Sequence, residues 1–164
     1  MEFSNQNKQF HLILAIAAIS VFFALAIASS LTHRPQIDEG MFASPALNLA
    51  TVGHFGTTVL ETEKSPLTRI EQRTYWVMPL YLLNVSASFK TLGFSLFSMR
   101  FVNVLWGFGL LLAWYFIVLK LTDNKKVALL CLILLSCDYT VLDTSASGRM
   151  DMMSASLGFI GIAS

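Results

Sequence analysis

The feature that most constrains this chain is an unbroken apolar stretch at residues 10–32, which ends at His33-Arg34-Pro35. A helix needs about 20 apolar residues to cross the hydrocarbon core of a bilayer, and this stretch is long enough. The composition agrees, because 55% of the residues are hydrophobic and only 13% are charged. We therefore expect lipid, rather than water, to surround much of the folded chain.

The same stretch has an alternative interpretation as a cleaved signal peptide. Ala26-Ile27-Ala28 followed by Ser29 is typical of a small-residue cleavage site, and Lys8 lies upstream. The apolar core of a signal peptide is only about 7–15 residues long, however, and further apolar segments follow here. A retained membrane span is the expected outcome.

Three more apolar segments follow the first. They cover residues 96–119, residues 127–145, where Asp138 and Asp143 interrupt the far end, and a stretch from residue 150. The last stretch is too short to cross a hydrocarbon core of about 30 Å, so we expect a partial span whose remainder is missing. The sequence thus predicts an all-α, polytopic membrane protein in which residues 1–164 form the N-terminal part of one transmembrane domain.

Residues 76–93 allow two topologies. If they cross the membrane, Lys120, Lys125 and Lys126 fall outside the cell; if they lie in the interface, the three lysines fall inside with Lys8. Cytoplasmic loops carry an excess of Lys and Arg, which favours an interfacial or re-entrant helix. Residues 33–95 then form a long loop on the extracytoplasmic side.

The charge balance and the two cysteines argue against several kinds of binding and cross-linking. The net charge is +1, from 11 Lys and Arg against 10 Asp and Glu, and this balance argues against nucleic acid. Cys131 and Cys137 lie on different faces of one apolar segment, so neither a disulfide nor a metal clip is indicated. No metal and no cofactor are predicted.

The expected topology brings three groups of charged residues to one face of the membrane. Charges in or beside spans tend to line a cavity, pair with each other or bind an ionic substrate. Each group could instead have a purely structural role. Asp38 could cap a helix, and Arg100 could extend to the lipid headgroups. Arg149 and Asp151 could form an ion pair, although their i, i+2 spacing on one helix disfavours it. The candidate site residues are Asp38, Glu39, Arg100, Asp138, Asp143, Arg149 and Asp151.

The order of several short motifs is more informative than any one of them. They are Ile37-Asp38-Glu39-Gly40, Tyr75-Trp76-Val77-Met78-Pro79-Leu80-Tyr81-Leu82-Leu83, Phe89-Lys90-Thr91-Leu92-Gly93, Ser95-Leu96-Phe97-Ser98-Met99-Arg100 and Ser147-Gly148-Arg149-Met150-Asp151. In this order they resemble the N-terminal part of the C-type membrane glycosyltransferases, in the branch of protein O-mannosyltransferases and aminoarabinose transferases. The chain departs from many relatives by having Met78-Pro79 where they have two prolines.

The resemblance implies inverting transfer of a sugar from a polyprenyl-phosphate donor to a lipid or protein acceptor on the extracytoplasmic face. Asp38 would be the general base with Glu39 beside it, because a positioned carboxylate can accept the acceptor's proton. Arg100, or else Arg149, would stabilise the departing phosphate, and Asp151 would orient an arginine or touch the sugar. A bacterial inner membrane is the expected location.

Two other interpretations stay open. A transporter or a lipid-binding subunit could use the same charges, because ionisable groups in membranes also mark transport pathways. A transporter would more naturally place acids and broken helices near the midplane than at one surface. The chain could also be a truncated product with no activity of its own.

Overall fold

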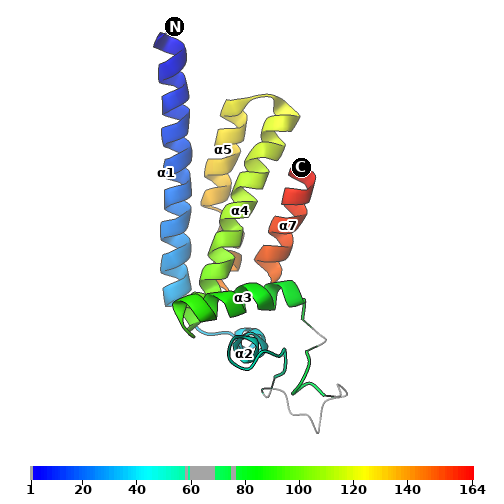
Figure 1. Cartoon of the computed structure of the whole chain (residues 1–164). Helices are drawn as coiled ribbons and strands as arrows, with labels where there is room; N and C mark the ends of the chain where they lie inside the picture. The colour runs from blue at the N-terminus through cyan, green and yellow to red at the C-terminus, as the bar shows by residue number, and fades with distance from the viewer. Residues whose placement is uncertain (1, 58, 60–68, 75–76) are drawn as a thin grey trace.

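The computed structural model describes residues 2–57, 59, 69–74 and 77–164. In this part of the chain every regular element is an α-helix and none is a strand, as the sequence predicts (Figure 1). The helices are α1 (Glu2–Thr32), α2 (Ile37–Thr51), α3 (Pro79–Leu92), α4 (Leu96–Thr122), α5 (Lys125–Ser136), α6 (Tyr139–Ala146) and α7 (Asp151–Ala163).

Two of these helices are long and apolar enough to cross a membrane. They are the Lys8–Thr32 part of α1, with 25 residues, and α4, with 27. The pair α5 and α6 makes a third candidate if the two helices together count as one span, but the pair is bent by 55°. α7 is a shorter apolar helix, at the place where a partial span was expected.

Local sequence signals account for the helix ends. Pro35 follows α1 closely and cannot continue a helix, and Pro79 occupies the first turn of α3, where its missing N–H costs nothing. Ser95 caps α4 by accepting a hydrogen bond from the Ser98 N–H at 3.0 Å. Gly93 ends α3 at φ +84°, a backbone conformation that favours glycine.

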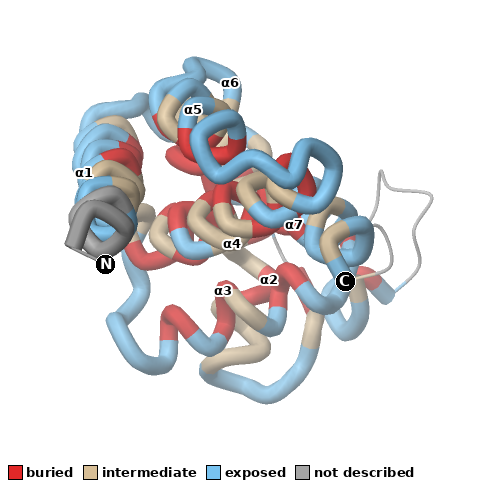
Figure 2. Tube along the Cα trace, turned by 90° about the horizontal axis from the view of Figure 1, so that it is seen from above, coloured by how far each residue is buried: buried red, intermediate tan, exposed pale blue. Residues whose placement is uncertain are grey.

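α4 is the centre of the molecule and contacts α1, α3, α5, α6 and α7. Figure 1 shows α3 lying across one end of α1, α4 and α7, with α2 beyond it. The view along the bundle in Figure 2 shows α1 and α7 on different sides of α4. The helices α2 and α3 therefore cover one end of the bundle.

Buried side chains form two clusters. One joins α2 and α3 to α4 and α7, around Phe42, Tyr81 and Met99, and the other joins α1 to α4 and α5, around Phe22 and Leu111. Gly107 of α4 has no side chain, and this lets neighbouring helices approach closely. A Cβ at this position would collide with the Oγ of Ser145 and lie 2.7 Å from the Phe22 ring. α1 and α6 therefore pack directly against the α4 backbone at this point.

Two predictions for the helices can be compared with the structure, and a third prediction concerns a loop. The third span was expected to run through residues 127–145, but it breaks because Asp138 accepts a hydrogen bond from the Val141 N–H and starts a new helix. The sequence of residues 39–52 also predicts a short helix, broken or bent around Pro45, and α2 continues through Pro45 without a break. The charged residues between 61 and 73 also predict an exposed loop, but residues 61–68 lie outside the described part of the chain.

Candidate functional site

A buried ion pair joins α2 to α4 at the end of the bundle that α2 and α3 cover. Arg100 Nε donates to Glu39 Oε1 at 2.7 Å, and its Nη2 donates to Oε2 at 2.8 Å. Both side chains are almost fully buried, with 1% of Arg100 and 2% of Glu39 exposed. This bidentate contact fixes the relative position of the two helices, because the planar guanidinium donates two parallel hydrogen bonds to the two carboxylate oxygens.

Arg100 also closes the end of α1. Its Nη1 donates to the carbonyl oxygens of Ser30 at 2.7 Å and His33 at 3.0 Å, and its Nη2 donates to that of Arg34 at 3.2 Å. These carbonyls belong to the last turn of α1 and the residues after it, where no intrahelical donor is available. All five N–H groups of Arg100 are thus used within the protein.

Glu39 is equally well satisfied. Besides Arg100, its carboxylate accepts hydrogen bonds from the backbone N–H groups of Gln36 at 2.9 Å and Gly148 at 2.7 Å. Burial by itself raises the pKa of the Glu39 carboxyl, but the hydrogen bonds from Arg100, Gln36 and Gly148 outweigh it, so the pKa lies below its ordinary value of 4.5. Glu39 is therefore ionised at neutral pH.

The turn from α6 to α7 is tied to this pair. Gly148 sits against Glu39, and a Cβ on it would lie 2.9 Å from Oε1 and 3.0 Å from the sulfur of Met99. Asn103 of α4, fully buried, donates from Nδ2 to the carbonyls of Ser147 and Arg149. Residues 147–149 are thus held between Glu39 and Asn103.

Arg149 of this turn forms a half-exposed charge cluster with Asp38 and Asp151. Arg149 Nη1 lies 3.3 Å from Asp38 Oδ2, and Arg149 Nε lies 2.9 Å from Asp151 Oδ2. Between 42% and 51% of each of the three side chains is exposed. The structure thus corrects the expectation that the spacing of Arg149 and Asp151 disfavours an ion pair, because Arg149 precedes α7 rather than lying within it.

The remaining two candidates, Asp138 and Asp143, take no part in these ion pairs. Asp143 of α6 contacts His33 after α1, with Oδ1 3.4 Å from Nε2. Asp138 lines a small cavity with Trp114, Cys131 and Leu134, against the middle of α4 and α5. It was expected at the outer turn with the other acids, whereas the break between α5 and α6 places it part-way along the bundle.

Four residues of the site were missed by the sequence analysis. Asn103 lies within an apolar span, where an amide is unusual, and this could have singled it out. Tyr81 accepts a hydrogen bond from Asn103 at 3.4 Å, and burial raises the pKa of its hydroxyl. Gly148 and His33 act through tertiary contacts that no local pattern indicates.

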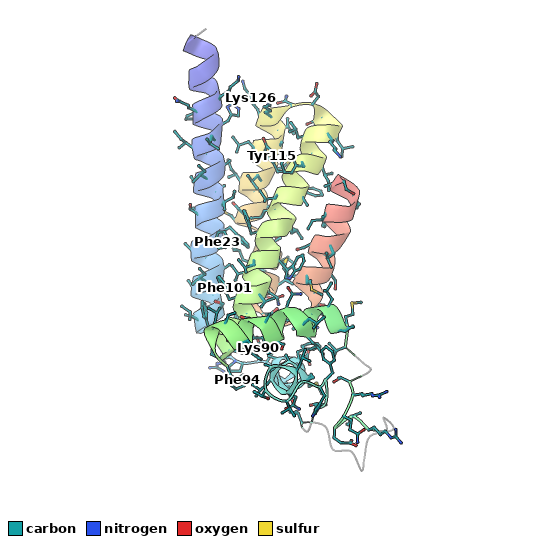
Figure 3. The ribbon with its side chains drawn as sticks, in the orientation of Figure 1. Phe23, Lys90, Phe94, Phe101, Tyr115 and Lys126 are labelled. Atoms are coloured by element: carbon teal, nitrogen blue, oxygen red, sulfur yellow. The ribbon has the colours of Figure 1, made fainter. Side chains whose placement is uncertain are left out.

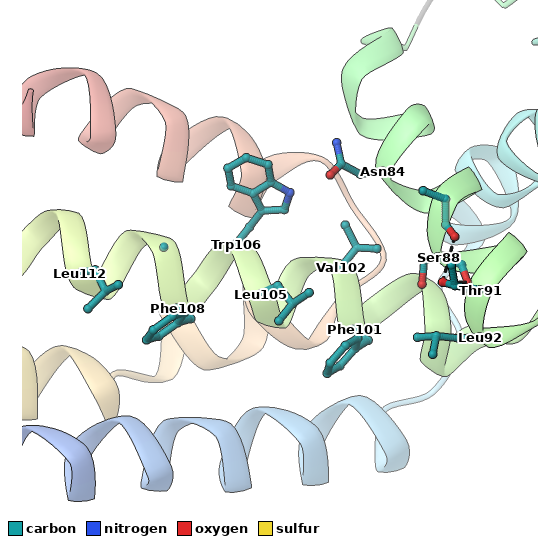
Figure 4. A pocket seen from close by; sticks show the side chains of 12 residues that line it. Asn84, Ser88, Thr91, Leu92, Phe101, Val102, Leu105, Trp106, Phe108 and Leu112 are labelled. Atoms are coloured by element: carbon teal, nitrogen blue, oxygen red, sulfur yellow. Dashed lines mark hydrogen bonds between the residues drawn. The ribbon is translucent and has the colours of Figure 1, made fainter.

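Two cavities are lined partly by residues of α3, and one of them also includes Glu39 of the site. One of about 390 Å³ is lined by Gln36, Glu39 and Met99, among others. The second, of about 630 Å³, is a groove between α3 and α4 (Figure 4). Its wall on α4 is apolar and aromatic, with Phe101, Trp106 and Phe108. Its wall on α3 carries polar side chains, which are Asn84, Ser88 and Thr91.

The cluster of Asp38, Arg149 and Asp151 can accept a proton and bind an anion at adjacent points. Among the described residues, no group of three or more His, Cys, Asp or Glu side chains could hold a metal ion. Comparison of the chain with protein-family models, with curated proteins and with solved structures finds no match.

Proposed function

We propose that this chain carries part of the catalytic site of a glycosyltransferase that moves a sugar from a polyprenyl-phosphate donor to a lipid or protein acceptor. The observation that carries the proposal is the arrangement of Arg149 between two half-exposed carboxylates, Asp38 and Asp151, at the end of an apolar helix bundle. The proposal also rests on the motif resemblance, which supplies the reaction class.

Asp38 is the proposed general base. The acceptor's oxygen or nitrogen attacks the anomeric carbon, and the bond from that carbon to the phosphate oxygen breaks with its electron pair leaving on the phosphate. The acceptor's proton passes to Asp38, a step for which a positioned carboxylate is suited. A single displacement of this kind inverts the anomeric centre.

Arg149 is the proposed phosphate-binding residue. Its guanidinium is half exposed, so it can contact a donor while Asp151 holds it in place. A fixed positive charge stabilises the negative charge that develops on the departing phosphate. The sequence analysis favoured Arg100 for the phosphate contact, and the proposal assigns this contact to Arg149 instead. To bind a phosphate, Arg100 would have to break hydrogen bonds to Glu39 or to α1.

Glu39, Arg100 and Asn103 are the proposed positioning residues. They join α1, α2, α4 and the turn at 147–149, and they need not touch the substrate. The groove between α3 and α4 fits a hydrocarbon chain of the donor, because its α4 wall is apolar and its volume is in the range of ligand sites.

The proposed location is a cell membrane, with a bacterial inner membrane favoured by the resemblance. Lys8, Lys125 and Lys126 lie together at the other end of the bundle, and the tendency of lysines to stay in the cytoplasm then puts Asp38 and Arg149 outside. The helices α2 and α3 become extracytoplasmic, interfacial helices.

The test is sugar transfer from radiolabelled polyprenyl-phosphate sugars by membranes that carry the full-length protein. We expect Asp38→Asn to lower the transfer rate by about 10²–10⁴-fold, the usual contribution of a general base. Asp143→Asn is the matched control, because Asp143 is a similarly exposed carboxylate that pairs with His33 instead. Equal rates for Asp38→Asn and wild type would remove Asp38 from the mechanism.

One observation favours a second candidate, a membrane transporter. Asp138 is an exposed carboxylate at the break between α5 and α6, and broken helices with ionisable groups mark transport pathways. The test measures proton-coupled uptake of a solute by vesicles that contain the protein. Uptake that Asp138→Asn abolishes, together with no consumption of any polyprenyl-phosphate sugar, would favour this candidate over the first.

A further inference from the structure

The end of the bundle opposite the charge cluster carries a basic pocket. It lies between the start of α1 and the turn from α4 to α5 and has a volume of about 440 Å³. Figure 3 shows Lys126 beside α1, far from Lys90 and Phe94 at the other end. The pocket combines three cations with one carboxylate, and its lining is Lys8, His11, Asp123, Asn124, Lys125 and Lys126.

An apolar cavity continues from this pocket. Its volume is about 330 Å³, and it shares His11 and Lys126 with the basic pocket. From there it follows α1 and α5, which supply Leu14, Leu130 and Ile133 to its wall. Both helices belong to candidate membrane spans, so this cavity lies where the hydrocarbon chains of a bilayer would begin.

We propose that the two cavities together form a binding site for an anionic glycerophospholipid. The phosphate group would lie among Lys8, Lys125 and Lys126, and one acyl chain would follow the groove between α1 and α5. Basic pockets between membrane helices are known to bind such headgroups. A zwitterionic lipid would bring its own cation toward the lysines, and a soluble phosphate would leave the apolar groove unused.

The site is separate from the proposed sugar transfer, because it lies at the other end of the bundle and uses none of the same residues. It depends only on the membrane setting of α1 and α5 and on the three lysines. Failure of the glycosyltransferase proposal would leave it untouched, and the reverse also holds.

The experiment is native mass spectrometry of the purified protein in neutral detergent, titrated with dioleoylphosphatidylglycerol. We expect Lys125→Gln with Lys126→Gln to weaken binding by about fivefold for each lysine removed. Arg34→Gln with Lys90→Gln is the matched control, because it removes the same charge from exposed residues at the other end and should leave binding unchanged. Equal loss in both double variants, or none in either, would overturn the proposal.

Two further measurements test the headgroup and the chain separately. Dioleoylphosphatidylcholine should bind at least tenfold more weakly than the phosphatidylglycerol, and glycerol 3-phosphate should not displace the lipid. Leu130→Trp should also weaken binding, because Leu130 is 56% exposed and lines the groove that the chain would fill. Equal affinity for the two lipids, displacement by glycerol 3-phosphate, or unchanged binding in Leu130→Trp would each contradict the proposed site.

Discussion

Among single residues, Glu39 and Arg100 have the largest expected effect on stability. Each is nearly fully buried and each satisfies the other, so removal of one charge leaves the other without its partner. We expect Glu39→Gln to lower the free energy of unfolding by about 3–5 kcal/mol, the usual cost of breaking a buried pair. Equilibrium unfolding in mixed detergent micelles measures this.

Asp38→Asn provides the comparison for this prediction. Asp38 is the neighbour of Glu39 and also pairs with an arginine, but 46% of its side chain is exposed. Exposed pairs contribute about 0–1 kcal/mol, so this variant should unfold nearly like the wild type. Similar losses in the two variants would mean that burial does not distinguish the two ion pairs.

The same pair predicts how stability depends on acid. The pKa of Glu39 in the folded protein lies below the ordinary 4.5 because of its hydrogen bonds from Arg100, Gln36 and Gly148, although burial opposes them. Its contribution is therefore complete above about pH 4.5 and is lost as the pH falls through that value toward the folded pKa.

The difference in unfolding free energy between wild type and Glu39→Gln should accordingly shrink below pH 4.5 and stay constant between pH 6 and 8. Thermal unfolding of both proteins across this pH range checks the prediction. A difference that stays the same down to pH 3 would show that the ionised carboxylate does not provide the stabilisation.

At the scale of helices, α1 and α6 pack closely against α4 at Gly107. An alanine at Gly107 would press its Cβ against Ser145 and the ring of Phe22, and both neighbours are buried. We expect Gly107→Ala to destabilise the protein by about 1–3 kcal/mol through overpacking. Unfolding in mixed micelles is again the measurement.

Gly109 gives the control on the same helix. A Cβ there would meet only Ile160 Cδ1, at an ordinary contact distance of 3.9 Å. Alanine is favoured over glycine within helices by about 1 kcal/mol, so Gly109→Ala should be neutral or stabilising. If both variants destabilise alike, the close approach of α1 and α6 to Gly107 is not what limits the larger residue.

Helix positions were more predictable from the sequence than the contacts between helices. Apolar length alone identifies α1 and α4, since apolar runs of this length are typical of helices that cross a membrane. Asp138 shows the limit at this scale. It was recognised as an interruption of the third span, but whether an acid in an apolar run faces a cavity or caps a new helix depends on its backbone neighbours.

Over the whole molecule, the site depends on contacts between residues that are far apart in the sequence. Glu39 lies 61 residues from Arg100 and 109 from Gly148, and no local pattern encodes either contact. Sequence reasoning placed six of the seven charged candidates at the correct end of the bundle, because the spans fix their approximate depth, but it misplaced Asp138. It could not decide which arginine is buried, since that depends on how α2 and the turn at 147–149 fold over α4.

The arrangement of the whole molecule makes one last prediction, about its orientation. Because α3 lies across the end of the bundle, Lys90 and Lys126 are at opposite ends (Figure 3). Lys125 lines the same basic pocket as Lys126 and Lys8, and such lysines tend to remain in the cytoplasm. A cysteine at position 90 should therefore face the outside of the cell and one at position 125 the inside.

A membrane-impermeant maleimide distinguishes these positions in a background where Cys131 and Cys137, the two free cysteines, are changed to serine. Intact cells should label Lys90→Cys but not Lys125→Cys, and opened membranes should label both. The background protein without cysteine gives the blank. Labelling of Lys125→Cys but not of Lys90→Cys in intact cells would reverse the orientation of the bundle. Asp38 and Arg149 would then lie on the cytoplasmic side, away from an extracytoplasmic acceptor.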